Sequence, residues 1–424
     1  MNRKQHYEGR ILLKAALTGV IAGAVVSVFR ELLDMSASMR EAFYQNILVE
    51  PWLLFLPMTA AVLLAFVLHK LLTLEPWAGG SGIPQVKGVI AGKIKMNAWS
   101  VIVVKFIAAT MAIGAGLSLG RQGPSVQFGA CVGEIIGHIR SRRGKRETRG
   151  LTVVGAGAGL AAAFNAPLAG VVFCMEELAP RLSSAQILSG IIATAAATVV
   201  SQMFFSERPV FDFADLPSIA IGEHWLLFAA LGVFCGLLGV LFNRGLLFSL
   251  NTYDRIGLRG TTKLLPALFL SIVFGYCLPQ ILGGGDILVD ELFATEHSLH
   301  LLFVLLVGKY CFTLLCFGSG VPGGIFLPML AIGAIGGAIF GELAIVMGII
   351  HPDLMPCCII FGMAGCFTGA VKAPVSSSIL IMELTGSFEY MLPLLLVSFT
   401  ACIVLDMTAT RPIYGALLQR NLHS

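Results

Sequence analysis

The chemistry of this sequence centres on a short polar turn, Gly120 to Ser125 (GRQGPS), between two apolar stretches. Pro124 and the apolar run 126–136 predict a helix that begins just after the turn, with proline where its missing N–H costs nothing. The free backbone N–H groups at such a start, including that of Gly123, carry partial positive charge and suit an anion. Taken alone, the pattern is also typical of a loop that caps a helix in a soluble protein.

Two glycine-rich segments offer further uncharged donors. The segment 79–84 (GGSGIP) places the hydroxyl of Ser81 in a tight turn, although serine in such a turn is also a common N-cap. In the segment 318–328 (GSGVPGGIFLP), glycines leave the backbone N–H groups of Ile325 and Phe326 unobstructed. Such a pair is also typical of a core, but this run interrupts a stretch where a spanning helix should be continuous.

A fourth donor is the hydroxyl of Tyr414, in the segment 411–416 (RPIYGA). A single tyrosine near a helix end is ordinarily an anchor at the membrane interface. The four segments are far apart in sequence, so the helices that carry them decide whether they form one site.

The composition predicts that those helices cross a membrane many times. The chain has 424 residues, of which 57% are hydrophobic and 12% charged, and its mean hydropathy is +0.87. These values exclude an ordinary soluble protein. The 48 glycines allow helices to approach closely and to break within the bilayer. The first apolar run, 11–29, lacks a clear cleavage site and is predicted to be the first helix.

Basic residues cluster in two places, the start of the first helix and one loop, and both are expected to face the cytoplasm. They are Arg3, Lys4, Arg10 and Lys14, before and at the start of the first helix, and the run 140–149 (RSRRGKRETR). The positive-inside rule accounts for both groups, so we expect a cytoplasmic N-terminus and no nucleic-acid partner. The ten cysteines are scattered through apolar runs without metal-ligand spacing, so we expect no metal and no cofactor.

Apolar segments of uneven length recur along the whole chain and predict an all-α polytopic membrane protein. They lie at about 11–29, 52–72, 99–119, 126–137, 151–173, 186–205, 225–249, 263–282, 300–317, 325–350, 356–382 and 391–409. Several are shorter than the roughly 20 residues that a full span needs, and others are long with internal glycine or proline. Broken, tilted helices of a transporter have such a pattern.

The two halves of the chain align when Pro124 is set over Pro328. Further matches are Gly129 with Gly333, Gly133 with Gly337, Gly79–Ser81 with Gly283–Gly285, Ala166-Pro167 with Ala373-Pro374, and Met175-Glu176 with Met382-Glu383. We interpret this as an internal duplication with halves 1–205 and 225–424 joined by a polar linker, 206–224. A repeat of this kind places a binding site between the halves, near the bilayer midplane.

Together these motifs resemble the CLC family of chloride channels and chloride/proton antiporters, from about Ile11 to Leu418. The residues that carry the resemblance are GGSGIP at 79–84, GRQGP at 120–124, GLAAAFNAPLAGVVFCMEEL at 159–178, GVPGGIFLPML at 320–330 and Tyr414. The resemblance implies two inverted halves and a homodimer with one pore per subunit. Because ten residues follow Tyr414, we expect no cytoplasmic nucleotide-sensing domains.

The resemblance also implies an anion site. The side-chain hydroxyls of Ser81 and Tyr414 and the backbone N–H groups of Ile325 and Phe326 would hold a central chloride. Gly82, Ile83 and Gly123 would complete its surroundings. Uncharged donors bind an anion without trapping it, as conduction requires. Chloride is the favoured substrate, with other halides or nitrate as alternatives.

Gln122 departs from the family pattern, which is usually GREGP. The family's glutamate competes with chloride for the outer site, whereas a carboxamide is uncharged and does not titrate. We therefore predict passive or weakly proton-coupled flux; the alternative is a proton-coupled antiporter, native or altered from glutamate. The neighbouring Arg121 is predicted either to attract anions at this gate or to fix the loop by pairing with an acid.

The inner proton acceptor of the family's antiporters matches Glu177, beside Glu176, so part of a proton relay is retained. An acid pair here is equally explained as a solvated helix end or as a partner for Arg181. Enzyme motifs such as G-x-S-x-G or H-E-x-x-H are lacking, so we expect no enzyme activity. A cation-coupled solute carrier is a more distant alternative. The expected location is the bacterial inner membrane.

Overall fold

The computed structural model describes residues 3–49, 55–139, 144–206, 209–211, 213 and 221–423. In these residues the chain is helical, and its one pair of bridged extended residues is Gly120 with Gly324. The α-helices are α1 (Arg3–Val49), α2 (Phe55–Leu74), α3 (Ile83–Ile90), α4 (Ala98–Gly114), α5 (Gln122–His138), α6 (Lys145–Phe164), α7 (Pro167–Phe173), α8 (Ser184–Phe204), α9 (Ile221–Ile256), α10 (Leu265–Cys277), α11 (Asp286–Ala294), α12 (Leu299–Gly318), α13 (Phe326–Val346), α14 (Met355–Val371), α15 (Pro374–Thr385), α16 (Met391–Met407) and α17 (Ile413–His423). The predicted all-α fold is confirmed.

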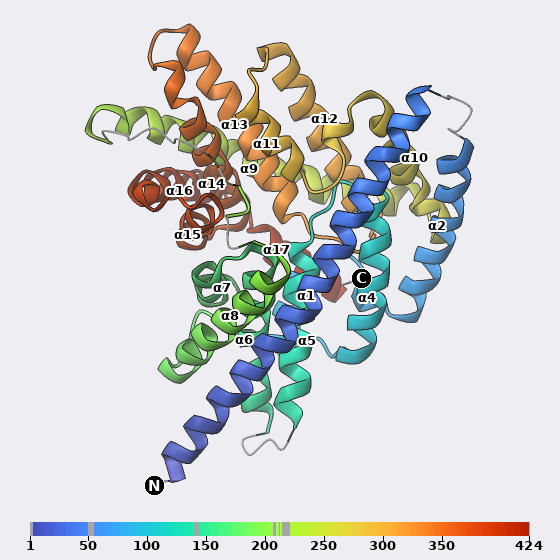
Figure 1. Ribbon diagram of the computed structural model, residues 1–424, viewed down its shortest axis with the longest axis vertical. Coiled ribbons are helices and arrows are strands. Elements are labelled where there is room, and N and C mark those ends of the chain that lie inside the picture. The colour runs from blue at the N-terminus through green and yellow to red at the C-terminus, as the bar shows by residue number, and fades with distance from the viewer. Residues whose placement is uncertain are drawn as a thin grey trace.

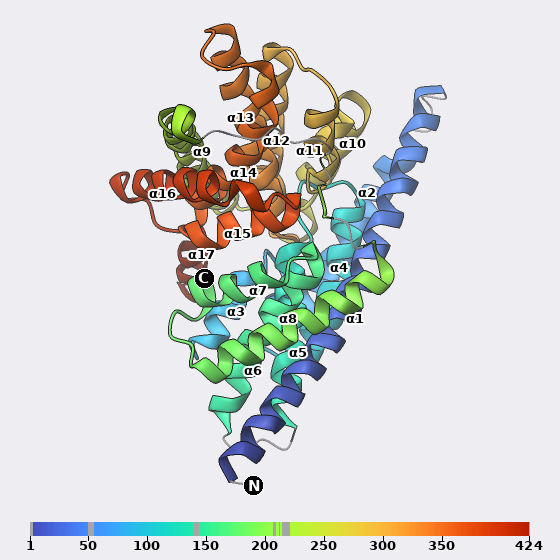
Figure 2. The same ribbon diagram turned by 60° about the vertical axis from the view of Figure 1, so that its left-hand side comes forward.

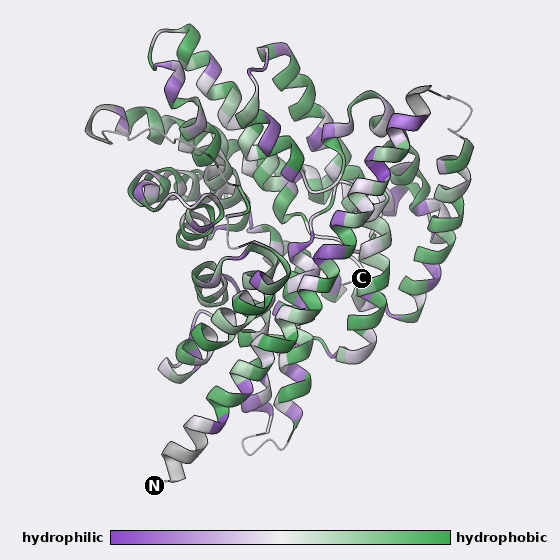
Figure 3. Ribbon diagram, in the orientation of Figure 1, coloured by the Kyte–Doolittle hydropathy of each residue, from purple (hydrophilic) through white to green (hydrophobic). Residues whose placement is uncertain are grey.

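Nine helices of the described ranges are long and apolar enough to cross a membrane. Apolar residues cover most of their length in Figure 3. The first of them is longer than predicted: α1 contains the run 11–29 but extends from Arg3 to Val49, over 47 residues. Its diagonal course along the molecule is visible in Figures 1 and 2. The chain is therefore a multi-pass integral membrane protein.

Most of the residues that the predicted duplication aligns lie in two sets of helices, α4–α8 and α12–α16. In both views α5, α6 and α8 lie toward one end of the molecule and α12, α13 and α14 toward the other (Figures 1 and 2). The matching glycines serve the same purpose in each set. A Cβ at Gly129 of α5 would lie 2.0 Å from the carbonyl oxygen of Gly155 on α6, and one at Gly333 of α13 would lie 2.6 Å from that of Gly362 on α14. Only glycine permits these close crossings.

Two predicted apolar segments, 151–173 and 356–382, are broken at matching points. Asn165 ends α6 in the left-handed region (φ 55°), and Lys372 ends α14 in the same way (φ 67°). The Ala-Pro pair that follows each residue opens the next short helix, α7 or α15, because proline suits the first helical turn. The breaks create the N-termini of two short helices, α7 and α15.

The predicted linker, 206–224, lies largely outside the described residues. Helix α9 begins at Ile221, within the predicted range. Of the described linker residues, Phe211 is buried and donates its backbone N–H to the carbonyl oxygen of Leu384, 2.9 Å away. This part of the connection is packed against the second half of the chain.

Candidate anion-binding site

The three glycine-rich turns predicted to form a site are joined to one another by backbone hydrogen bonds. Gly120 and Gly324 exchange two N–H···O=C bonds of 2.6 and 2.7 Å, which links the turn before α5 to the turn before α13. Gly323 donates to the carbonyl oxygen of Gly80 at 3.1 Å, which links the same turn to the one before α3. Residues separated by more than 200 positions thus form one structure.

Gly82 allows helix α3 to begin beside this junction. Its φ of 100° lies in a region that favours glycine, and its N–H donates to the side-chain oxygen of Gln85, 3.1 Å away. Ile83, the next residue, is buried at the first position of α3. A Cβ at Gly123 would lie 2.7 Å from the Oγ of Ser81 and 3.0 Å from the Cα of Gly324. Ser81, Gly123 and the turn before α13 therefore meet.

The hydroxyls of Ser81 and Tyr414 are buried without a partner among the described residues. Ser81 is 1% exposed and Tyr414 is 0% exposed. Tyr414 lies in the first turn of α17, which packs against α3, the helix that follows Ser81. Its burial rules out an anchor at the membrane interface. Two buried hydroxyl donors without acceptors are suited to an anion.

Ile325 and Phe326 lie at the start of α13, and both interpretations of them apply. Their side chains are core: Phe326 packs against the rings of Phe164, Phe173 and Phe367, with centroids 5.4, 6.4 and 4.3 Å away. Their backbone N–H groups belong to the helix N-terminus, where no intrahelical acceptor is available. The aromatic packing therefore fixes the position of donors that remain free for a ligand.

Two buried lysines, neither of which was predicted from the sequence, support the glycine turns. Lys105 of α4 donates to the carbonyl oxygen of Gly80 at 3.0 Å, and Lys309 of α12 donates to those of Ile281 and Gly283 at 2.9 and 2.8 Å. Both side chains are 0% exposed. The offset that aligns Pro124 with Pro328 also aligns these lysines, so the repeat itself was a signal for them.

Gln122, the first residue of α5, is fully buried, and neither its amide nitrogen nor its amide oxygen has a partner among the described residues. Its side chain folds back toward Gly120, where a Cβ would lie 2.5 Å from the amide oxygen. Arg121 takes the structural role considered for it: one terminal nitrogen of its guanidinium lies 3.3 Å from the carboxylate of Asp34 on α1. This contact fixes the turn to the first helix.

Glu177 is paired, but with Lys87 and not with Arg181. The ammonium of Lys87 on α3 lies 2.6 Å from the Glu177 carboxylate. The Glu177 side chain is 6% exposed and that of Lys87 is 28% exposed, so the pair is accessible from the lysine side. Glu177 lies in a short π-helical turn, Cys174–Leu178, that contacts α3. A partner 90 residues away in the sequence was not predicted.

Glu176 caps a helix of the other half. Its two carboxylate oxygens accept the backbone N–H groups of Val375 and Ser376 at 3.3 and 2.7 Å, at the start of α15. Glu383 reciprocates: its carboxylate accepts those of Leu168 and Ala169 at 3.0 and 2.7 Å, at the start of α7. The repeat thus exchanges carboxylates between halves. The geometry favours a helix-end role for Glu176 over the predicted proton relay.

The groups that this arrangement offers to a ligand are uncharged: buried hydroxyls, helix N-termini and amide groups. The two buried lysines bind the carbonyl oxygens of the turns instead. Uncharged donors replace water around an anion without a permanent countercharge in contact with it. A family of membrane proteins shares the underlying sequence pattern: the family described as voltage gated chloride channel matches residues 60–406. The chain belongs to the CLC family.

Relatives within the CLC family include the H(+)/Cl(-) exchange transporter ClcA of Vibrio parahaemolyticus, which is 36% identical over 97% of this chain and 90% of its own. ClcA of Klebsiella pneumoniae is 32% identical over 97% of this chain and 89% of its own. A slow cyanobacterial Cl-/H+ antiporter of known structure has a TM-score of 0.90 at 30% identity, covering 98% of each chain. A CLC-type fluoride/proton antiporter, at 22% identity and a TM-score of 0.78, shares the fold over 96% of this chain and 97% of its own.

Proposed function

We propose that this protein is a CLC-type chloride transporter whose flux is passive or weakly coupled to protons. Ser81, Tyr414 and the N–H groups of Ile325 and Phe326 bind the central anion in this proposal, with Gly82, Ile83 and Gly123 around it. Its support is the meeting of three glycine turns at Ser81. Among the described residues, the buried hydroxyls of Ser81 and of Tyr414, on the helix that packs against α3, have no partner. Other halides and nitrate are alternative substrates.

The observation that carries the weak coupling is the buried carboxamide of Gln122 at the start of α5. An amide neither gains nor loses a proton near neutral pH, so it cannot carry a proton past the anion. It also lacks the negative charge with which a carboxylate would compete with chloride. The gate position therefore resembles a permanently neutral state in the proposal.

The pair between Lys87 and Glu177 does not add to this support. Burial raises the pKa of the Glu177 carboxyl, and the ammonium of Lys87, 2.6 Å away, lowers it by less, so the pKa lies above its ordinary value. Glu177 therefore keeps its capacity to take up a proton, and the proposal of weak coupling rests on Gln122.

The test is chloride efflux from proteoliposomes with simultaneous recording of external pH. We expect rapid chloride efflux with little or no proton movement. Robust proton uptake driven by a chloride gradient would overturn the weak coupling while leaving chloride transport intact. A lack of chloride flux in protein shown to be folded would overturn the transport proposal itself.

Gln122→Glu should restore a titratable, anionic group at the gate. We expect slower flux at neutral pH, because the carboxylate competes with chloride, and faster flux as the pH falls and the carboxylate is protonated. Gln122→Ala is the control: it offers no carboxylate, so its flux should stay independent of pH. Identical pH profiles for the two variants would contradict the assignment of Gln122 as the gate.

A proton-coupled antiporter is the second candidate. It is favoured by the retained Glu177 and by the function of the relatives, which are exchange transporters. Under this alternative a fixed ratio of protons to chloride should appear in the unmodified protein. A cation-coupled solute carrier would instead require sodium-dependent uptake of an organic substrate. Neither candidate involves enzyme activity, cofactor or nucleic acid.

We further propose a homodimer in the bacterial inner membrane, with the N-terminus in the cytoplasm. Helices α7, α8, α15 and α16 form one side of the molecule (Figure 1). This side exposes apolar residues such as Val199 and Ile403 together with the half-buried carboxylates of Glu176 and Glu383. Exposure of carboxylates to lipid is costly, so we expect a second copy of the chain, and not lipid, to cover this side.

A further inference from the structure

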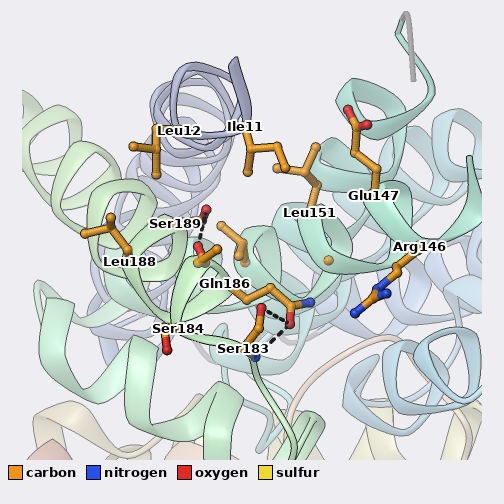
Figure 4. Close-up of a pocket in the computed structure, with 13 residues that line it drawn as sticks. Ile11, Leu12, Arg146, Glu147, Leu151, Ser183, Ser184, Gln186, Leu188 and Ser189 are labelled. Carbon is orange, nitrogen blue, oxygen red and sulfur yellow. Dashed lines mark hydrogen bonds between the residues drawn. The ribbon is translucent and has the colours of Figure 1, made fainter. Parts of the chain in front are cut away.

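A cavity of about 420 Å³ lies between α1, α6 and α8, apart from the proposed anion site. Figure 4 shows its lining from these three helices. One wall is apolar and includes Ile11 and Leu12 of α1, Leu151 of α6 and Leu188 of α8. This volume is within the range of small-molecule binding sites, and nothing in the transport proposal makes use of it.

The other end of the cavity is polar and is formed in part by the first turns of α6, which carry the described basic residues of the run 145–149. Arg146 of α6 is exposed and extends toward the amide of Gln186 on α8 (Figure 4). The side-chain oxygen of Gln186 accepts from the N–H and the hydroxyl of Ser183, both at 3.0 Å. These two bonds orient the amide so that its NH2 group faces Gly150, where a Cβ would lie 3.1 Å away. A guanidinium and an amide NH2 are thus presented to the same space.

Glu147 borders the cavity but does not neutralise the positive charge at its polar end. Glu147 is nearly buried, and its carboxylate is bound by the ammonium of Lys14 at 2.6 Å. In Figure 4 its carboxylate points away from the guanidinium of Arg146. Lys145, which precedes Arg146 in the first turn of α6, is exposed and adds positive charge to this end of the helix.

We propose that this cavity binds an anionic phospholipid, with the phosphate at Arg146 and Gln186 and an acyl chain along the apolar wall. The chemistry of the two ends matches the two ends of such a lipid. Basic pockets between membrane helices on the cytoplasmic side recognise anionic headgroups. The proposal is independent of the transport function, because none of these residues belongs to the anion site.

A free phosphate would satisfy the polar end but would leave the apolar wall uncovered. The cavity opens beside Leu188, which is half exposed on α8, a helix apolar enough to span the membrane. An occupant with a hydrocarbon chain therefore covers more apolar surface than a soluble anion does. This difference is the basis for committing to a lipid.

The test uses the full-length protein reconstituted in phosphatidylcholine vesicles with and without phosphatidylglycerol, extracted in mild detergent and examined by native mass spectrometry. We expect phosphatidylglycerol to be retained in preference to phosphatidylcholine. Arg146→Gln should reduce that retention about fivefold, the effect of one basic residue beside an anionic headgroup. Arg149→Gln is the matched control, because Arg149 is exposed on the same helix but does not line the cavity, and its retention should stay near that of the unmodified protein.

A second variant tests the cavity without altering charge. Gly150→Leu should fill the cavity and displace the lipid. The substitution should be tolerated, because the new Cβ meets only the flexible end of Gln186. Equal retention by Arg146→Gln and Arg149→Gln, or unchanged retention in Gly150→Leu, would overturn the proposal. So would displacement of the lipid by inorganic phosphate alone, which would identify a site for a soluble anion.

Discussion

At the scale of single residues, the buried hydroxyls of Ser81 and Tyr414 are the most informative groups. A buried hydroxyl without a partner costs about 1–3 kcal/mol, and both lie in this state among the described residues. An anion that accepts from both would offset that cost. Without a bound anion, the protein is therefore expected to be less stable than a variant in which an apolar side chain replaces one of these hydroxyls.

Tyr414→Phe should weaken chloride binding about tenfold or more, since a hydrogen bond to a charged group contributes about 1.5–3 kcal/mol. In chloride-free buffer the same variant should be at least as stable as the unmodified protein, because it removes an unpartnered hydroxyl. Calorimetric titration and thermal unfolding with and without chloride measure the two effects. Tyr310→Phe is the control: its hydroxyl donates to the carbonyl oxygen of Leu241, so its loss should leave chloride affinity unchanged.

Lys87 is the charged partner of Glu177 and opposes the effect of burial on its pKa. In a Gln122→Glu background, Lys87→Gln should raise the number of protons moved per chloride, because Glu177 would lose the ammonium that lowers its pKa. Parallel recording of chloride and pH in proteoliposomes gives this ratio. Lys93→Gln, which alters an exposed lysine just beyond α3, is the matched control. A ratio that is the same in both variants would show that Lys87 does not restrain Glu177.

At the scale of helices, the exchange of Glu176 and Glu383 joins the two halves. Each carboxylate accepts two backbone N–H groups at the N-terminus of a short helix in the opposite half. These N–H groups have no intrahelical acceptor, and a carboxylate also interacts favourably with the helix dipole. The short helices α7 and α15 are thereby fixed against each other.

Glu176→Ala and Glu383→Ala should each destabilise the protein by about 1–2 kcal/mol, the usual effect of removing a charged cap. The two losses should be similar because the repeat gives both residues the same task. Thermal unfolding in detergent measures them, with Glu389→Ala as a control at an exposed acid. If Glu176→Ala changed proton movement without changing stability, Glu176 would belong to a proton relay instead.

At the scale of the whole molecule, the side formed by α7, α8, α15 and α16 is the proposed dimer interface (Figures 1 and 2). Val199 on α8 and Ile403 on α16 are 54% and 57% exposed there. Apolar exposure alone does not distinguish a partner from lipid. The half-buried acids between these helices favour a protein partner over lipid, because lipid cannot solvate them.

Val199→Trp combined with Ile403→Trp should separate the two copies, because the larger rings obstruct close packing of the apolar sides. Light scattering in detergent should then give the mass of a monomer with one detergent micelle. Leu63→Trp, on the exposed side of α2 far from this interface (Figure 1), should remain dimeric. Retention of the dimer in the double variant would place the interface elsewhere.

Much of the fold follows from local pattern. The hydropathy of the long segments, the aligned glycines and the Ala-Pro pairs after Asn165 and Lys372 predict broken helices in two related halves. The location of the turns before α3, α5 and α13 was also predictable, because Gly and Pro act on the backbone within a few residues. The core role of the Phe326 ring was only one of two interpretations, since a residue's neighbours are not written in its own segment.

The sequence by itself determined the family, the all-helical membrane fold and the uncharged Gln122 in the turn before α5, because each depends on residue type and spacing along the chain. Only the tertiary structure decided which charged groups meet which partners: Lys87 meets Glu177, Glu176 meets the start of α15, and Lys14 meets Glu147. Partners far apart in the chain are selected by how helices pack, and many partners of opposite charge are equally compatible with one sequence. The close glycine crossings hold α5 against α6 and α13 against α14, and the packing of the helices determines which charges pair.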